Sequence, residues 1–148
     1  MIKTCIIGVS GFGDTHFRDL LREADAGRME PVAAAIINQD EEAAKCEKLR
    51  SLGTEIFDDY EEMLSAWGDR ADLCMIPTGI HWHAPMTVAA LEAGMNVFVE
   101  KPAAPTIQAL QSMRSAEKRT GRFVAVGFQH TYNEATHVMK RRIVAGEF

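Results

Sequence analysis

Short apolar stretches alternate along the chain with stretches in which apolar residues recur at the helical period. The short stretches are apolar or β-branched and are bounded by Gly, Pro, Asp or Asn, as strands are. The predicted strands are Ile2–Gly8, Val32–Ile37, Glu55–Phe57, Leu73–Ile76, Asn96–Val99 and Phe123–Gly127. The predicted helices are Thr15–Ala26, Glu41–Leu52, Tyr60–Trp67, Trp82–Ala93 and Thr106–Thr120. This alternation predicts βαβ units and therefore an α/β fold with a doubly wound parallel sheet between two helical layers.

The chain continues past the last predicted strand. A helix is predicted at Glu134–Val144, and no further strand follows it before Phe148. The apolar side of this helix needs a partner surface, because an isolated helix of this length is marginal in water. We therefore expect residues 1–127 to form one domain and residues 128–148 to begin a truncated second α/β domain of a longer protein.

Composition and charge narrow the classes of partner. The 148 residues are 47% hydrophobic and suit one domain with a sizeable core. Sixteen Lys and Arg against twenty-one Asp and Glu give a net charge of −5, which argues against binding to nucleic acid or to an anionic membrane. The apolar run Val32–Ile37 is far shorter than a spanning helix, and the N-terminus has no signal-peptide pattern. We expect a cytoplasmic protein that binds a small molecule or another protein.

The cysteine pattern agrees with that location. The three cysteines, Cys5, Cys46 and Cys74, are odd in number and form no Cys-x-x-Cys motif. This pattern argues against a disulfide scaffold and a zinc site, and indicates reduced thiols.

A glycine-rich segment, Gly8–Gly13, follows the first predicted strand and precedes a helix. In a dinucleotide site such glycines permit a tight turn and close approach of the backbone to the pyrophosphate at the helix N-terminus. Gly8 and Gly13 hold the first and third places of that pattern, but Ser10 holds the second, with Gly11 beside it. A tight turn without a ligand is the alternative interpretation.

The end of the second strand bears on cofactor choice. A carboxylate there usually binds the adenosine ribose of NAD, and a neutral residue with a nearby Arg admits the 2′-phosphate of NADP. This chain has Asn38, with no Arg immediately after it. The choice between NAD and NADP therefore stays open, and Asn38 as a mere helix cap is the alternative.

The strand Asn96–Val99 runs into Glu100, Lys101 and Pro102. Ligands of open α/β sheets lie beyond the carboxyl ends of the strands, so Lys101 should point into the crevice. An ammonium group there can stabilise the alkoxide that develops as hydride leaves a carbinol carbon. A surface Glu-Lys pair is the alternative.

Read together, these motifs and several others resemble the Gfo/Idh/MocA family of nicotinamide-dependent oxidoreductases. The resemblance covers nearly the whole chain. It rests on Gly8–Gly13, Phe57–Leu64, Ile76–His83, Ala90–Gly94, Glu100–Pro102 and Val126–Phe128. It implies a Rossmann domain followed by an α/β substrate domain that mediates homo-oligomerisation. This chain departs from the family pattern at Ser10 and Asn38, and at Gly79, where Pro is usual.

The resemblance also implies roles for individual residues. Lys101 is the expected catalytic residue, Glu100 and Pro102 shape the nicotinamide side, and the loop Thr78–His83 borders the cofactor. The expected cofactor-binding residues are Gly8, Ser10, Gly11, Phe12, Gly13, Asn38, Thr78, Gly79, His81, His83, Glu100, Lys101 and Pro102. His81 and His83 are too few for a metal site, because no further ligands lie nearby except Glu92, so no metal is expected.

A binding module for another nucleotide such as coenzyme A is compatible with the glycine turn but leaves Glu100–Pro102 unexplained. Two further hypotheses of function remain. The first is the NAD(P)-binding half of a dehydrogenase that acts on a sugar, inositol or related polyol, inactive alone because the family's histidine base lies in the second domain. The second is a non-catalytic regulator that senses a dinucleotide with the same fold. The presence of Lys101 favours the first.

Overall fold

A computed structural model describes residues 1–148 and contains one six-stranded parallel sheet in the order β3-β2-β1-β4-β5-β6. The strands are β1 (Ile2–Ile7), β2 (Met29–Ala35), β3 (Glu55–Phe57), β4 (Leu73–Ile76), β5 (Asn96–Val99) and β6 (Val124–Val126). The strand order reverses between β1 and β4, which is the switch point where open α/β sheets bind ligands. The predicted doubly wound Rossmann fold is confirmed.

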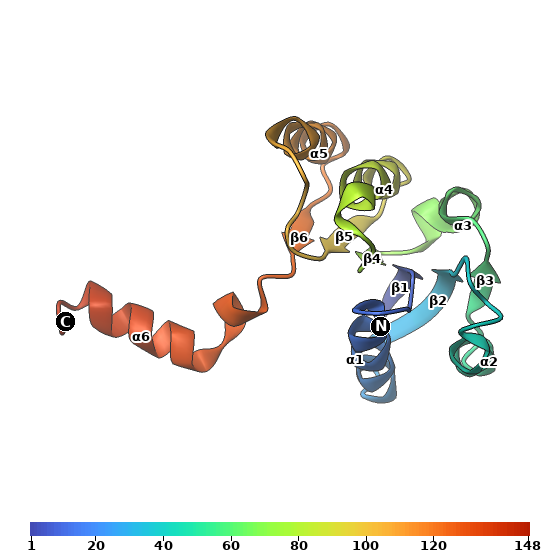
Figure 1. The fold of residues 1–148 in the computed structure, drawn as a ribbon, viewed down its shortest axis with the longest axis horizontal. Coiled ribbons are helices and arrows are strands. Elements are labelled where there is room, and N and C mark those ends of the chain that lie inside the picture. The colour runs from blue at the N-terminus through green and yellow to red at the C-terminus, as the bar shows by residue number, and fades with distance from the viewer.

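Helices lie on both faces of the sheet (Figure 1). They are α1 (Gly13–Asp25), α2 (Ala43–Ser51), α3 (Tyr60–Trp67), α4 (Ile80–Glu92), α5 (Ile107–Thr120) and α6 (Glu134–Val144). Helices α1 and α2 lie on one face, and α3, α4 and α5 lie on the other. The bounds of β3, β4, β5 and α3 are those that the sequence predicts.

Strand β2 begins earlier than its apolar pattern predicts. It starts at Met29 rather than Val32, and Pro31 lies inside the pairing with β1. Proline has no N–H to donate to a ladder, and the register between β1 and β2 shifts at this point, between Thr4 and Cys5. The apolar pattern therefore does not predict the first three residues of β2, because they include Glu30 and Pro31.

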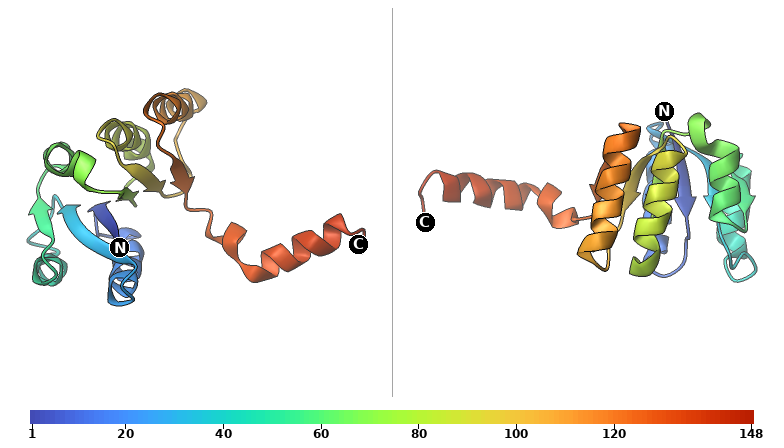
Figure 2. Two further views of the ribbon diagram at one scale, coloured as in Figure 1. Left: turned by 180° about the vertical axis from the view of Figure 1, so that it is seen from behind. Right: turned by 90° about the horizontal axis from the view of Figure 1, so that it is seen from above.

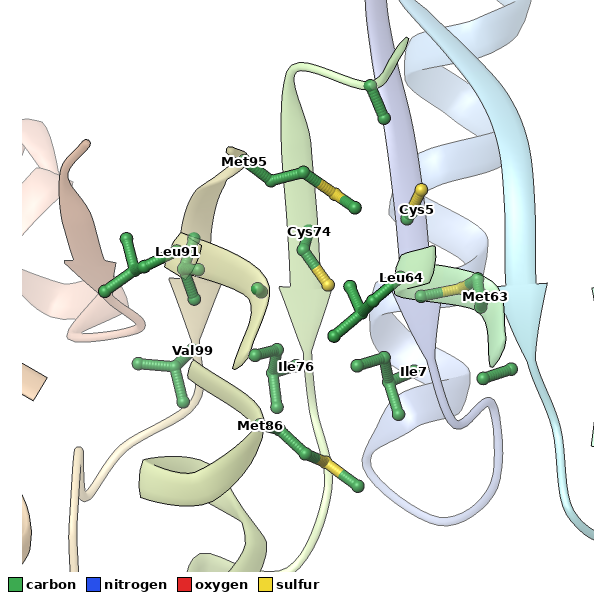
Figure 3. Close-up of a cluster of buried hydrophobic side chains, with 14 of the residues drawn as sticks. Cys5, Ile7, Met63, Leu64, Cys74, Ile76, Met86, Leu91, Met95 and Val99 are labelled. Carbon is green, nitrogen blue, oxygen red and sulfur yellow. The ribbon is translucent and has the colours of Figure 1, made fainter. Parts of the chain in front are cut away.

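Two apolar clusters fill the space between the sheet and its helices. Strand β1 alternates between them: Cys5 and Ile7 face α3 and α4, whereas Ile6 faces α1 and α2. Figure 3 shows part of the larger cluster. Its labelled members are Cys5, Ile7, Met63, Leu64, Cys74, Ile76, Met86, Leu91, Met95 and Val99. Cys5 and Cys74 are register partners on β1 and β4, and all three cysteines are free thiols.

Helix α6 lies apart from the sheet. The views in Figures 1 and 2 show it projecting beyond β6, and none of its residues is buried. Its apolar side chains Val138, Met139 and Ile143 are exposed. None of the helices combines the length and the apolar character that a membrane crossing requires.

Candidate functional site

The turn after β1 is shaped by glycines. Gly8 and Gly11 have φ values of +85° and +55°, which side-chain-bearing residues rarely adopt. A Cβ on Gly13 would lie 3.0 Å from the carbonyl oxygen of Gly8, so the start of α1 packs tightly against the end of β1. The N–H groups of Gly11 and Phe12 donate to no other backbone group. Two free donors thus lie beside the N-terminus of α1, where an anion is favoured.

This turn forms one wall of a cavity of about 710 Å³ at the carboxyl ends of the strands. That volume lies within the range of small-molecule sites. Six residues that the sequence identified as candidates line it: Gly8, Ser10, Phe12, Asn38, Thr78 and Gly79. They come from the ends of β1, β2 and β4, which the parallel sheet brings to one edge.

Sequence reasoning missed part of the cavity wall, because Ile37, Asp58, Asp59 and Tyr60 also line it. Trp82 lines it too, and it belongs to the loop Thr78–His83 that the sequence analysis expects to border the cofactor. The Tyr60 and Trp82 rings meet edge to face with centroids 6.5 Å apart. Asp58 and Asp59 directly follow β3, so the argument that ligands lie beyond strand ends applies to them as it does to Asn38.

Lys101 lies beside the glycine turn rather than inside the cavity. Its Nζ is 5.8 Å from the centroid of the Phe12 ring, and its side chain is exposed. The Lys101–Pro102 peptide bond is cis. The end of β5 and the turn after β1 therefore adjoin, and one side chain, Phe12, lies against both the cavity and the lysine.

Glu100 is buried and holds the backbone before that lysine. Its Oε1 lies 2.9 Å from Nε2 of His16 on α1, and its Oε2 accepts a hydrogen bond from the N–H of Lys101 at 3.0 Å. His16 is also buried, between the rings of Phe12 and Phe98. Glu100 therefore connects α1 to the Lys101 backbone and does not line the cavity.

The two candidate histidines before α4 differ in their surroundings. His83 is buried, with Nδ1 2.8 Å from the Pro102 carbonyl oxygen and Nε2 2.9 Å from that of Thr78. It thus connects the loop after β4 to the segment after Lys101 and has no ring nitrogen left for a ligand. His81 is exposed, and its ring lies against Gly79. A side chain at position 79 would contact that ring, with a Cβ only 2.9 Å from Cε1.

Asn38 contacts the glycine turn directly. Its Nδ2 donates to Ser10 Oγ at 3.1 Å and to Glu41 Oε2 at 2.8 Å. Behind it, Lys45 Nζ donates to the Val9 carbonyl oxygen at 2.7 Å. Burial alone would lower the pKa of Lys45, but its hydrogen bonds to Glu42 and Asp14 raise it above the ordinary value.

The arrangement fits a dinucleotide. Left-handed glycines and free N–H groups at the N-terminus of α1 suit a pyrophosphate, and an apolar wall with aromatic rings suits an adenine. Polar groups of Asn38 and Ser10 face the space between them. These residues would hold the adenosine and phosphate parts, and the segment at Lys101 would adjoin the far end of the cofactor.

Comparison with known proteins gives the same result. The chain is 29% identical over 147 residues to scyllo-inositol 2-dehydrogenase (NAD(+)) of Bacillus subtilis, covering 99% of this chain and 41% of that protein. It is 30% identical over 143 residues to inositol 2-dehydrogenase of Serratia proteamaculans, covering 96% of this chain and 41% of the relative. The chain thus spans about two fifths of the length of these curated relatives.

Solved structures agree in fold. An NAD-binding oxidoreductase of Klebsiella pneumoniae superposes with a TM-score of 0.79 at 29% identity, over 98% of this chain and 39% of that one. A scyllo-inositol dehydrogenase of Lactobacillus casei with bound NAD(H) and scyllo-inositol superposes with a TM-score of 0.85 at 22% identity, over 99% of this chain and 42% of that one. Residues 2–128 match the family described as "Oxidoreductase family, NAD-binding Rossmann fold". The chain therefore belongs to the Gfo/Idh/MocA family of oxidoreductases and comprises its NAD-binding Rossmann fold.

Proposed function

We propose that this chain is the dinucleotide-binding part of a dehydrogenase that transfers hydride between a nicotinamide cofactor and a polyol such as an inositol. The observation that carries the proposal is the juxtaposition of Lys101 with Phe12 of the glycine turn, with Nζ 5.8 Å from the ring centroid. This contact supports the proposal because it joins an exposed ammonium group to a residue that lines the cavity. The activities of the similar inositol dehydrogenases support the substrate class.

The cofactor supplies the hydride acceptor, and the residues of the chain bind and orient it. Gly8, Gly11 and Gly13 give the turn its shape, and Asn38 and Ser10 bind the ribose. Lys101 donates a hydrogen bond to the substrate hydroxyl and stabilises the developing alkoxide. His83 and Glu100 hold the two segments that border this lysine. Helix α6 begins the substrate domain, which supplies the remaining catalytic groups.

Binding of the dinucleotide is tested at Gly11. This residue is exposed, has φ +55°, and a Cβ there would meet nothing within 4 Å. Asp and Asn tolerate this conformation better than other residues, so both Gly11→Asp and Gly11→Asn should fold. The carboxylate, beside the free N–H groups, should repel the pyrophosphate, whereas the amide should not.

We expect isothermal titration of the 148-residue chain with NADH to show saturable binding. Gly11→Asp should weaken it at least about tenfold relative to Gly11→Asn, as expected for a new like charge within a few ångströms. Circular dichroism checks that both variants are folded. Absence of binding to NADH and NADPH at millimolar concentration, or equal binding by the two variants, would overturn the proposed site.

The catalytic role of Lys101 predicts a different outcome. Because Lys101 does not line the cavity, Lys101→Ala should leave the NADH dissociation constant within about twofold in this chain. In a protein that joins this domain to its substrate domain, the same substitution should lower kcat for polyol oxidation by orders of magnitude. A variant with unchanged kcat would remove Lys101 from the mechanism.

A further inference from the structure

The adenosine end of the cavity carries a negative charge at a position that the sequence pattern does not identify. Asn38 at the end of β2 is neutral, but its amide donates to the Glu41 carboxylate at 2.8 Å. Glu41 is exposed and forms no ion pair with any residue of the chain. Its charge is therefore not neutralised locally, and it adjoins the residue that lines the cavity.

The carboxylate is held in place by the glycine turn. Asn38 Nδ2 also donates to Ser10 Oγ at 3.1 Å, and Ser10 Oγ lies 3.4 Å from Asn38 Oδ1. The amide is thus oriented by Ser10 with its second N–H directed to Glu41. Ser10, Asn38 and Glu41 form a continuous hydrogen-bonded chain from the turn after β1 to the segment before α2.

Two cations lie near these three residues, and one of them, Lys45, is already paired with carboxylates. Lys45 Nζ contacts Asp14 at 3.1 Å and Glu42 at 2.8 Å in addition to the Val9 carbonyl oxygen. Arg50 donates to the side-chain oxygen of Gln39 at 2.7 Å. Lys45 is therefore neutralised by carboxylates. The guanidinium of Arg50 contacts only a neutral amide, and it does not line the cavity.

Two more carboxylates line the cavity on its other side. Asp58 and Asp59 follow β3, and Asp58 accepts a hydrogen bond from Gln39 at 2.6 Å. A phosphate on the 2′-oxygen of adenosine would therefore enter a space bordered by carboxylates from two strand ends. Ribose hydroxyls, in contrast, donate to carboxylates.

We propose that Glu41, positioned by Asn38 and Ser10, selects NAD(H) against NADP(H) in this chain. The inference rests on the proposed function, because it concerns the same cavity. Glu41 supplies the acidic group that the end of β2 lacks, from three residues further along the chain. Its negative charge repels the 2′-phosphate, so the specificity arises because NADP(H) binding is weakened.

The test compares dissociation constants for NADH and NADPH. We expect the chain to bind NADH about 10- to 100-fold more tightly than NADPH at low salt, the range that one or two like charges within several ångströms give near a protein surface. Added salt should narrow the difference, because screening weakens repulsion between exposed charges. Equal affinities for the two cofactors would overturn the proposal.

Glu41→Gln tests the residue itself. It removes the charge and keeps an oxygen that accepts from Asn38, so NADPH binding should strengthen about fivefold or more while NADH binding changes less than about twofold. Glu47→Gln makes the same change of net charge at an exposed position of α2 and should leave both constants unchanged. An equal NADPH gain in both variants, or none in Glu41→Gln, would refute the role of Glu41.

The binding measurements distinguish failure of the proposed dinucleotide site from failure of the proposed selectivity. If neither cofactor binds, the dinucleotide site itself is absent and the selectivity falls with it. If NADPH binds as tightly as NADH, the site stands and only the selectivity is wrong.

Discussion

Replacement of Gly127 by alanine tests whether the Glu100 carboxylate is held where the structure places it. A Cβ on Gly127 would lie 2.6 Å from Glu100 Oε1, closer than carbon and oxygen atoms pack. The same oxygen lies 2.9 Å from His16 Nε2, and both side chains are buried. The new methyl group must therefore displace the carboxylate, and the contact with His16 is lost.

We expect Gly127→Ala to lower the free energy of unfolding by about 2–4 kcal/mol, the range for a buried polar pair that is broken. Backbone strain contributes nothing, because Gly127 does not have a positive φ. The matched control is Gly121→Ala, where φ is +69° and a Cβ would meet nothing within 4 Å. That variant should lose only the cost of a left-handed residue, about 1–2 kcal/mol. Urea titrations followed by circular dichroism measure both.

A double mutant identifies the atom responsible. In a Glu100→Ala background the colliding carboxylate is absent, so Gly127→Ala should then cost less than about 1 kcal/mol. If Gly127→Ala destabilises the chain equally in both backgrounds, the collision with Glu100 is not the cause and the reasoning is refuted.

Three further substitutions have defined outcomes in urea titrations. His83→Ala removes the ring from two carbonyl oxygens and should cost about 2–3 kcal/mol of unfolding free energy; a cost below about 0.5 kcal/mol would contradict the bridging role. Lys45→Met removes the ammonium group from the Val9 carbonyl and two carboxylates, and should cost about 1 kcal/mol at low salt and less at high salt. Burial raises the pKa of the Cys5 thiol from 9.0 to about 12, so above pH 9 the unfolded chain loses a proton that the folded chain keeps. Stability should fall from pH 9 towards pH 12, and an unchanged slope in Cys5→Ala would exclude this thiol as a cause.

The periodicity of the sequence was sufficient for the fold because most strands are buried on both faces. Leu73–Ile76 is a continuous apolar run, and Val97–Val99 is one that follows Asn96; the observed β4 and β5 have the predicted bounds Leu73–Ile76 and Asn96–Val99. The start of β2 was not predictable in this way. Glu30 and Pro31 do not belong to an apolar run, and only their pairing with Lys3 and Thr4 makes them part of the strand.

Some parts of the candidate site are likewise predictable from local sequence patterns, and others are not. The turn at Gly8–Gly13 and the segment at Lys101 have local sequence patterns, and the topology of the sheet then brings them together. The contact of His16 with Glu100 spans 84 residues and has no local signal, since a histidine on a helix and a glutamate after a strand are common. Likewise, no local pattern indicates that the Trp82 ring contacts the Tyr60 ring in the wall of the cavity.

The contact between Ser10 and Asn38 changes the meaning of two departures from the family pattern. Taken singly, a serine in place of glycine and an asparagine in place of an acid each weaken the dinucleotide site. In the structure the two side chains bond to each other, and Asn38 bonds to Glu41. An aspartate at position 38 would face the like charge of Glu41, and a glycine at position 10 would leave the amide unoriented. The two departures are therefore parts of one hydrogen-bonded arrangement, in which Glu41 before α2 carries the negative charge.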